Sequence, residues 1–291
     1  MHVPSVEVHK AATLEEASAL LGRFSPDVRL LAGGTDVLVD LKSARYAVGH
    51  LVALGAIKSL RGAARTRDGL RIGALTTITE LDRSPLIAGA YAALRDATSQ
   101  MATPQVRNAA TVGGNVAGAV PCADLPPVLI AMGATALLWS AKGERTVPLE
   151  GLIVGPRRTI LRDDELLAAI DVPAPPARFG AAYARFGLRE ANSIAVAGVA
   201  AAVALNDDGT VSSARVALCA VAPVPKLVKS AASALVGRVL DEAACVQAAA
   251  AASAEAEPIS DLRGSADYRR RLVSTLTRRA LAAARQRVGR G

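Results

Sequence analysis

Two short motifs in this chain combine adjacent glycines with small polar side chains. The first is Ala-Gly-Gly-Thr-Asp at residues 32–36, and the second is Thr-Val-Gly-Gly-Asn at residues 111–115. Glycine permits backbone angles closed to other residues, and it lets peptide N–H groups approach a ligand without a Cβ atom in the way. Successive N–H groups that turn inward form a nest for an anion, most often a phosphate. The two motifs together therefore predict a ligand with a diphosphate and other polar parts.

The common nucleotide-binding fingerprints do not describe these motifs. A Rossmann unit requires G-x-G-x-x-G, whereas the glycines at 33–34 and 113–114 are adjacent. A P-loop requires a Lys after its last glycine, and neither pair has one. We therefore expect a diphosphate ligand that is held mainly by backbone amides.

The composition indicates a folded protein with an aliphatic core. Of 291 residues, 51% are hydrophobic and only 3% are aromatic. The net charge is +8, but no basic stretch carries the interleaved aromatic residues that stack on nucleic-acid bases. A solvated helix face, or a surface that docks an acidic partner, explains the charge better. Much of this charge lies near the C-terminus, at Arg263, Arg269, Arg270, Arg271, Arg278, Arg279, Arg285, Arg287 and Arg290.

The cysteines and the N-terminal residues indicate a reducing, cytoplasmic environment. Cys122, Cys219 and Cys245 are scattered and odd in number, so they form neither a disulfide framework nor a C-x-x-C metal pair. Residues 1–10 lack the apolar stretch of a signal peptide. The longest apolar runs, such as 194–205, are too short to span a bilayer.

Local patterns place the first motif after a strand and the second between two helices. A capping-box pattern at Thr13 and Glu16 predicts the start of the first helix. Alternation and turn signals predict strands at 6–9, 28–31, 51–54, 70–74, 135–139, 145–148 and within 160–172, and helices at 37–44, around 80–81, at 85–99 and at 123–132.

The pattern changes after a proline-rich segment at 173–176, which predicts a linker. Strands are expected at 181–186, 195–205 and 211–221, and an Asp-Gly pair at 208–209 predicts a hairpin between the last two. Helices are expected at 231–236, 242–256 and 268–287. We therefore predict an α+β protein with one domain at 1–176 and a second at 177–291.

Five motifs, in this order, resemble the FAD-binding subunit of the molybdenum hydroxylases, a family that includes xanthine dehydrogenase and carbon monoxide dehydrogenase. The resemblance runs nearly end to end. It rests on Ala-Gly-Gly-Thr-Asp (32–36), Ile-Gly-Ala-Leu-Thr-Thr (72–77), Thr-Val-Gly-Gly-Asn (111–115), Ala-Asp-Leu-Pro-Pro (123–127) and Pro-Ile-Ser-Asp-Leu-Arg-Gly-Ser-Ala-Asp-Tyr-Arg-Arg (258–270).

The resemblance implies a two-subdomain FAD-binding domain of the vanillyl-alcohol-oxidase type, followed by a C-terminal domain with a three-stranded antiparallel sheet and helices. It also implies that the two glycine motifs wrap the FAD diphosphate, that Thr76 and Thr77 offer hydroxyls near it, and that Asp124 binds ribityl or ribose hydroxyls. The full set of implied FAD contacts is Leu31, Ala32, Gly33, Gly34, Thr35, Asp36, Val37, Thr76, Thr77, Met101, Thr111, Gly113, Gly114, Asn115, Asp124, Leu167 and Arg185.

Some residues depart from the family pattern. Arg185 stands where many members have a Lys near the isoalloxazine ring, and Ser193 stands near a position where an aromatic ring shields the flavin. Ser193 would leave that face more open to an acceptor. Ala123 directly follows Cys122, without the cysteine-rich insertion of one branch, so no iron–sulfur cluster is expected in this chain. The histidines His2, His9 and His50 lie outside every motif, which favours non-covalent FAD.

The leading hypothesis is therefore an electron-transfer subunit without a catalytic acid or base and without a metal ligand set. It would pass electrons from the [2Fe-2S] clusters of a small partner subunit through FAD to an external acceptor. A large molybdopterin-binding subunit would complete a heterotrimer, as a dimer of heterotrimers, and the basic C-terminal helix with Arg269, Arg270, Arg271, Arg278 and Arg279 would offer a second contact. Two alternatives stay open: a free-standing flavin oxidase or reductase with its own small substrate, and a non-enzymatic nucleotide-binding module.

Overall fold

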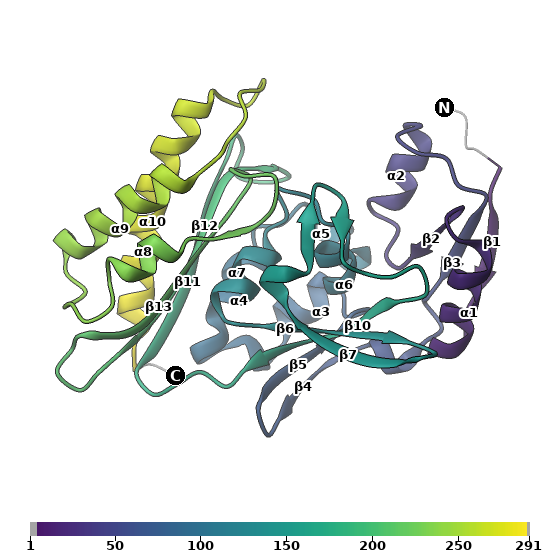
Figure 1. Cartoon of the computed structure of the whole chain (residues 1–291), viewed down its shortest axis with the longest axis horizontal. Coiled ribbons are helices and arrows are strands. Elements are labelled where there is room, and N and C mark those ends of the chain that lie inside the picture. Colours follow the sequence, from purple (N-terminus) through teal and green to yellow (C-terminus); the bar gives the residue numbers. More distant parts are fainter. Residues whose placement is uncertain (1–4, 290–291) are drawn as a thin grey trace.

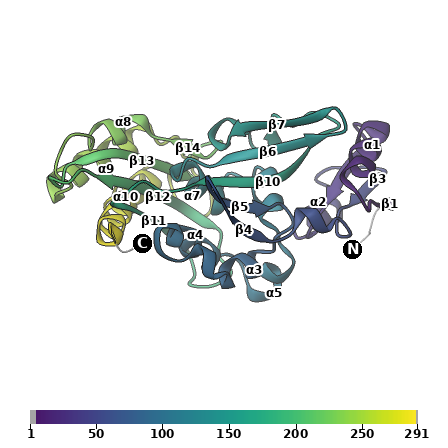
Figure 2. The same ribbon diagram turned by 90° about the horizontal axis from the view of Figure 1, so that it is seen from below.

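The computed structural model describes residues 5–289, whose main sheets follow one another along the long axis of the molecule (Figure 1). The N-terminal sheet lies at one end and the C-terminal sheet at the other, with a five-stranded sheet and its helices between them (Figures 1 and 2). His2 and Arg290 lie outside the described residues. Among the described residues, no helix is long and apolar enough to cross a membrane.

The N-terminal sheet is parallel and has the order β1-β3-β2. Helix α1 packs against one face of it, where Ala17 and Leu21 join the core. Thr13 caps α1 by accepting a hydrogen bond from the Glu16 amide, as predicted, while Glu16 accepts from Ala12 rather than from Thr13. The elements of this part are β1 (Glu7–Lys10), α1 (Leu14–Phe24), β2 (Val28–Leu31), α2 (Val37–Lys42) and β3 (His50–Ala53).

The central sheet has the strand order β4-β5-β10-β6-β7, and every neighbouring pair of strands in it is antiparallel. Its helices carry the second glycine motif and lie beside the C-terminal sheet (Figure 2). The strands are β4 (Ala63–Thr66), β5 (Gly69–Gly73), β6 (Thr135–Ser140), β7 (Gly143–Pro148) and β10 (Leu166–Pro173), with a small pair β8 (Ile153–Gly155) and β9 (Arg158–Thr159); the helices are α3 (Ile78–Arg83), α4 (Ala92–Thr98), α5 (Pro104–Ala109), α6 (Val112–Ala117) and α7 (Leu125–Ala131).

The predicted helix at 85–99 is wrong. The segment begins with two turns of 3-10 helix, Pro85–Ile87 and Gly89–Tyr91, and only α4 continues as an α-helix. Gly89 adopts a positive φ of 59°, which an α-helix cannot accommodate. Two further 3-10 turns lie at Lys58–Leu60 and Leu149–Gly151.

The C-terminal sheet has the order β11-β12-β13-β14, so the expected three-stranded sheet has a short fourth strand. The helices α10 and α8 pack on its outer face, with α9 packed against both of them, and α4 and α7 pack on its inner face (Figures 1 and 2). Tyr183 and Cys219 join the same buried cluster as Leu94 and Leu129, so the sheet shares a core with the helices of the central part. The elements are β11 (Phe179–Gly187), β12 (Ala195–Leu205), β13 (Val211–Cys219), β14 (Lys226–Leu227), α8 (Lys229–Ser233), α9 (Glu242–Glu255) and α10 (Ala266–Arg287).

Helix α10 is less available for docking than its sequence predicts. Arg269 is only 4% exposed, and its guanidinium donates to the carbonyls of Val196 and Ala220 and to Asp261. The expectation that Arg269 contributes to a surface is therefore wrong. Arg270 and Arg278 form ion pairs with Asp267 and Glu242 at the surface.

Candidate functional site

The two glycine motifs line one cavity of about 640 Å³. The first motif comes from the segment between β2 and α2, and the second comes from the start of α6. Strand β10 and the segment around β9 supply a further wall. Eleven of the seventeen expected contacts line this cavity: Ala32, Gly33, Gly34, Thr35, Asp36, Val37, Thr111, Gly113, Gly114, Asn115 and Leu167.

The first motif offers a run of backbone donors to the cavity. None of the amides of residues 33–37 donates a hydrogen bond to another residue within 5–289. Gly34 has a φ of 75°, which turns the chain in a way that favours glycine. Gly33 is required for a different reason, because a Cβ atom there would lie 1.9 Å from the carbonyl oxygen of Ala109. This segment therefore has the free amides of an anion nest.

The second motif is a helix start, and the prediction that it forms a second amide nest is wrong. Thr111 caps α6, and its hydroxyl accepts a hydrogen bond of 3.0 Å from the Gly114 amide. The amides of Val112 and Gly113 donate to the carbonyls of Thr76 and Ala74, and that of Asn115 donates to Thr111. Gly113 permits close packing instead, because a Cβ atom there would lie 2.6 Å from the Cβ atom of Ala74.

Asn115 adds one acceptor that no described residue satisfies. Its side-chain Oδ1 is buried and receives no hydrogen bond within 5–289. Buried polar atoms are normally paired. Because Asn115 lines the cavity, a hydroxyl or N–H group of a ligand would complete this atom's hydrogen bonding.

Charged side chains, which the sequence motifs did not reveal, close another part of the cavity. The Asp40 carboxylate is buried and accepts hydrogen bonds from Arg45 at 2.6 Å and from Arg157. Burial raises the pKa of the nearby Asp36 carboxyl, an effect that the positive charge of Arg157 opposes. Arg157 reaches Asp40 from the turn between β8 and β9, where its own φ is 59°. No local sequence signal indicates that contact, since it joins segments far apart in the chain.

Asp124 and Arg185 come together at a second place, beside Gln100, the residue that precedes Met101. Arg185 donates to the carbonyl of Gln100 at 2.9 Å, to Asp124 Oδ2 at 3.3 Å and to the carbonyl of Ser193. Asp124 is 7% exposed, and burial raises its pKa, while Arg185 and Tyr183 act in the opposite direction. A hollow of about 420 Å³, lined by Gln100 and residues 185–190, lies beside Arg185.

The remaining expected contacts do not line the large cavity. Leu31 is the last residue of β2. Its Cδ1 atom lies 3.3 Å from the position that a Cβ atom at Gly34 would occupy, so its side chain packs next to the first motif. Thr76 is 1% exposed and donates its hydroxyl to the Gly62 carbonyl, so it does not present that proton to a ligand. Thr77 caps α3 in a capping box with Glu80. Both threonines therefore act in the local structure that positions α6.

Two family models match the chain. The model described as "FAD binding domain in molybdopterin dehydrogenase" matches residues 4–175. The model described as "CO dehydrogenase flavoprotein C-terminal domain" matches residues 181–284.

Individual proteins resemble the chain over nearly its whole length. It is 37% identical to the carbon monoxide dehydrogenase medium chain of Hydrogenophaga pseudoflava, over 97% of each chain. It is 34% identical to a putative xanthine dehydrogenase FAD-binding subunit of Escherichia coli, over 95% of this chain and 94% of that one. A solved structure of the Hydrogenophaga pseudoflava carbon monoxide dehydrogenase superposes with a TM-score of 0.96 at 37% identity, over 99% of this chain and 100% of the matched chain.

Proposed function

The chain belongs to the FAD-binding subunits of the molybdopterin-dependent dehydrogenases, the molybdenum hydroxylases, and we propose that the cavity between its two glycine motifs holds the FAD diphosphate. The chain is an FAD-dependent oxidoreductase subunit with an electron-transfer role. The observation that carries the proposal for the site is the run of amides at residues 33–37 that donate to no residue within 5–289.

The residues of the cavity suit each chemical part of FAD. Amides 33–37 would hold the diphosphate oxygens, because backbone donors in a nest suit a diffuse negative charge. Asn115 Oδ1 would accept a hydrogen bond from a hydroxyl or an N–H group, and the buried side chain of Leu167 would contact an aromatic ring. Arg157 lies on the same cavity and would add positive charge near the phosphates. The site fits FAD without a covalent bond.

We propose a separate role for the pair Asp124 and Arg185 and for Met101, which follows the Gln100 that Arg185 contacts. Arg185 would set the electrostatic potential at the isoalloxazine end, and Asp124 would accept from ribityl hydroxyls. The segment around Ser193 would form the edge of that region, because the Ser193 carbonyl is held by Arg185. No residue of the chain is required as a catalytic acid or base. When bound, FAD supplies the redox group that takes up electrons and passes them on.

We further propose that this chain acts as the middle member of a heterotrimer, assembled as a dimer of heterotrimers. A small subunit with [2Fe-2S] clusters would deliver the electrons, and a large molybdopterin subunit would oxidise the substrate. Two matched chains, named as a medium chain and an FAD-binding subunit, support an assembly of several subunits.

We also propose a division into a two-subdomain FAD domain of the vanillyl-alcohol-oxidase type at 1–176 and a C-terminal domain at 177–291, with the boundary just beyond β10, whose last residue is Pro173.

A competition experiment tests the diphosphate site. FAD should bind the flavin-free chain one to one, ADP should compete with it, and FMN, which lacks the diphosphate, should bind much more weakly. Titration calorimetry and flavin fluorescence both report this binding. If FMN binds as tightly as FAD and ADP does not compete, the amides of residues 33–37 do not hold the diphosphate.

Rapid-mixing spectroscopy tests the electron-transfer role. Reduction of the flavin by a substrate of the complex should be slow with the isolated chain and fast after both partner subunits are added. Equally fast reduction of the isolated chain by a small organic substrate would instead indicate a free-standing flavoenzyme.

A further inference from the structure

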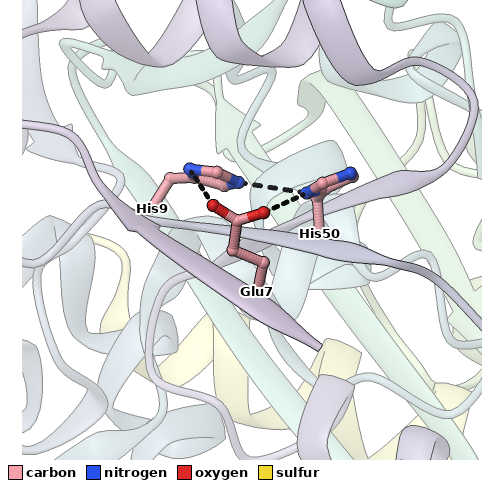
Figure 3. A group of neighbouring side chains, drawn as sticks. All are labelled: Glu7, His9 and His50. Carbon is pink, nitrogen blue, oxygen red and sulfur yellow. Dashed lines mark hydrogen bonds and ion pairs between the residues drawn. The ribbon is translucent and has the colours of Figure 1, made fainter. Parts of the chain in front are cut away.

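One face of the N-terminal sheet carries a cluster of three side chains, Glu7, His9 and His50 (Figure 3). None of the three belongs to a glycine motif. Strand β1 runs parallel to β3 with Glu7 opposite His50. Side chains two residues apart on a strand point to the same face, so Glu7 and His9 both face His50. None of the three lines the cavity of the glycine motifs.

We propose that these three side chains bind a divalent cation of the zinc class, with Zn²⁺ as the best match. Imidazole nitrogen and carboxylate oxygen are both ligands that Zn²⁺ accepts. His9 Nε2 lies 3.1 Å from His50 Nδ1, and His50 Nδ1 lies 3.6 Å from Glu7 Oε2. Two ligands of a tetrahedral zinc ion with bonds of about 2.0–2.1 Å lie about 3.3 Å apart. These two separations lie on either side of that value, and the three ligand atoms all lie within 4.8 Å of one another. Rotation of the exposed Glu7 side chain, with smaller movements of the rings, would bring them to one cation.

The tautomer of one ring changes when a cation binds. With no metal, one ring must donate an N–H group to the other across the 3.1 Å contact. A cation requires a lone pair from both nitrogens, so the proton of the donating nitrogen moves to the other nitrogen of the same ring. Ring ¹⁵N chemical shifts, which differ between protonated and unprotonated nitrogens, detect this change of tautomer.

The rings are held in place by Phe24, at the end of α1. Its ring stacks on His50 with centroids 3.8 Å apart and on His9 with centroids 4.7 Å apart. This packing limits the movement of the rings before a cation arrives, which lowers the entropy lost on binding. Glu7 is the exposed member, with a side chain 67% accessible, so the site is open to solvent for metal entry and for a water molecule as the fourth ligand.

The test uses the untagged full chain with its FAD, and Zn²⁺ alone as the probe. Equilibrium dialysis gives the stoichiometry, and ring ¹H–¹⁵N spectra of the histidines identify which rings respond. We expect one Zn²⁺ per chain, with shifts of the His9 and His50 resonances but not of those of His2. His9→Gln and His50→Gln each remove a metal ligand, so the affinity for Zn²⁺ should fall strongly. Loss of a hydrogen-bond partner of a metal ligand lowers metal affinity by roughly 10- to 100-fold, and these two variants should lose more than that.

Three further variants separate the loss of a metal ligand from a general effect on the fold. Glu7→Gln removes an exposed ligand that the fold does not need, so it should weaken Zn²⁺ binding while FAD content and the circular dichroism spectrum stay unchanged. Glu15→Gln, on the exposed face of α1, and Cys122→Ala should bind Zn²⁺ like the unmodified chain. The proposal is overturned if no Zn²⁺ binds at large excess, if the His9 and His50 variants bind it unchanged, or if only the His2 ring responds.

Discussion

The hydroxyl of Tyr183 donates a hydrogen bond of 2.6 Å to Oδ1 of Asp124. Tyr183 lies on β11, and Asp124 directly precedes α7, so this bond connects the C-terminal sheet to the helices of the central part. Burial raises the pKa of the Tyr183 hydroxyl well above its ordinary value, and the nearby Asp124 carboxylate adds to the effect. Tyr183 therefore stays protonated at neutral pH and remains a donor.

Substitution of Tyr183 by Phe should destabilise the chain. The change removes a donor to a buried carboxylate, and hydrogen bonds to charged groups contribute about 1.5–3 kcal/mol to the free energy of unfolding. Denaturant unfolding curves measure the loss. Tyr268→Phe is the matched control, because the Tyr268 hydroxyl donates to no residue within 5–289. Equal stability of the two variants would contradict the role of the Tyr183 bond.

Glycine substitutions should separate FAD binding from folding. Gly114→Val should abolish FAD binding, because Gly114 lines the cavity, and should cost some stability, because a Cβ there would lie 2.9 Å from the Thr111 hydroxyl that caps α6. Gly34→Val should lose FAD and also about 1–2 kcal/mol of stability, because its φ is 75°. Flavin absorbance and thermal unfolding measure the two effects.

Gly55→Ala is the control for that set, because a Cβ atom added at Gly55 would have no neighbouring atom within 4 Å and the φ of Gly55 is not positive. It should match the unmodified chain in both measurements. Full flavin occupancy in Gly114→Val would mean that the start of α6 does not contact the cofactor.

The ion pair of Glu165 with Arg145 should make stability depend on pH in the acid range. Two hydrogen bonds of 2.7 Å from Arg145 hold the pKa of Glu165 below its ordinary value of 4.5. The unfolded chain then takes up this proton at a higher pH than the folded chain does. The stability from this pair is present above pH 4.5 and is lost as the pH falls through the folded value.

Glu165→Gln measures that contribution. The difference in free energy of unfolding between the unmodified chain and the variant should be largest above about pH 5 and should shrink on acidification. Both proteins are unfolded at one fixed FAD concentration. Glu15→Gln, an exposed carboxyl without an ion-pair partner among the described residues, should give no such trend. A difference that is constant with pH would argue against the pair.

Charge on α10 should affect assembly through Arg271 and Arg279, which are exposed. Deletion of the residues after Asp261 is unsuitable as a test, because it removes Val273, Leu276 and other core residues of α10. Arg271→Glu with Arg279→Glu should instead weaken association with the partner subunits at low salt, and less so at high salt.

The control for assembly is Lys42→Glu with Lys58→Glu, which changes the net charge equally in the N-terminal part. Salt-dependent association is measured by light scattering or by surface binding. If both double variants assemble alike at every salt concentration, α10 does not dock a partner.

Much of the fold follows from local patterns in the sequence. The expected strand at 28–31 matches β2, and the expected strand at 195–205 matches β12, because runs of apolar residues bounded by turn signals are local features. The order of the motifs also indicates the family and its cofactor, which the family models and relatives confirm. The break in the expected helix at 85–99 was not predicted, because helix propensity does not indicate that Gly89 adopts a positive φ.

Only the tertiary structure decided which polar groups form hydrogen bonds and with which partners. The two glycine motifs look alike in sequence, yet the amides of residues 33–37 are unpaired within 5–289, while Gly113 donates to Ala74 and Val112 donates to Thr76. Arg269 looks like a surface cation, but it is buried against β12 because its guanidinium meets Asp261 and backbone carbonyls. A hydrogen bond depends on which distant segment comes within about 3 Å, and residue order alone does not carry that distance.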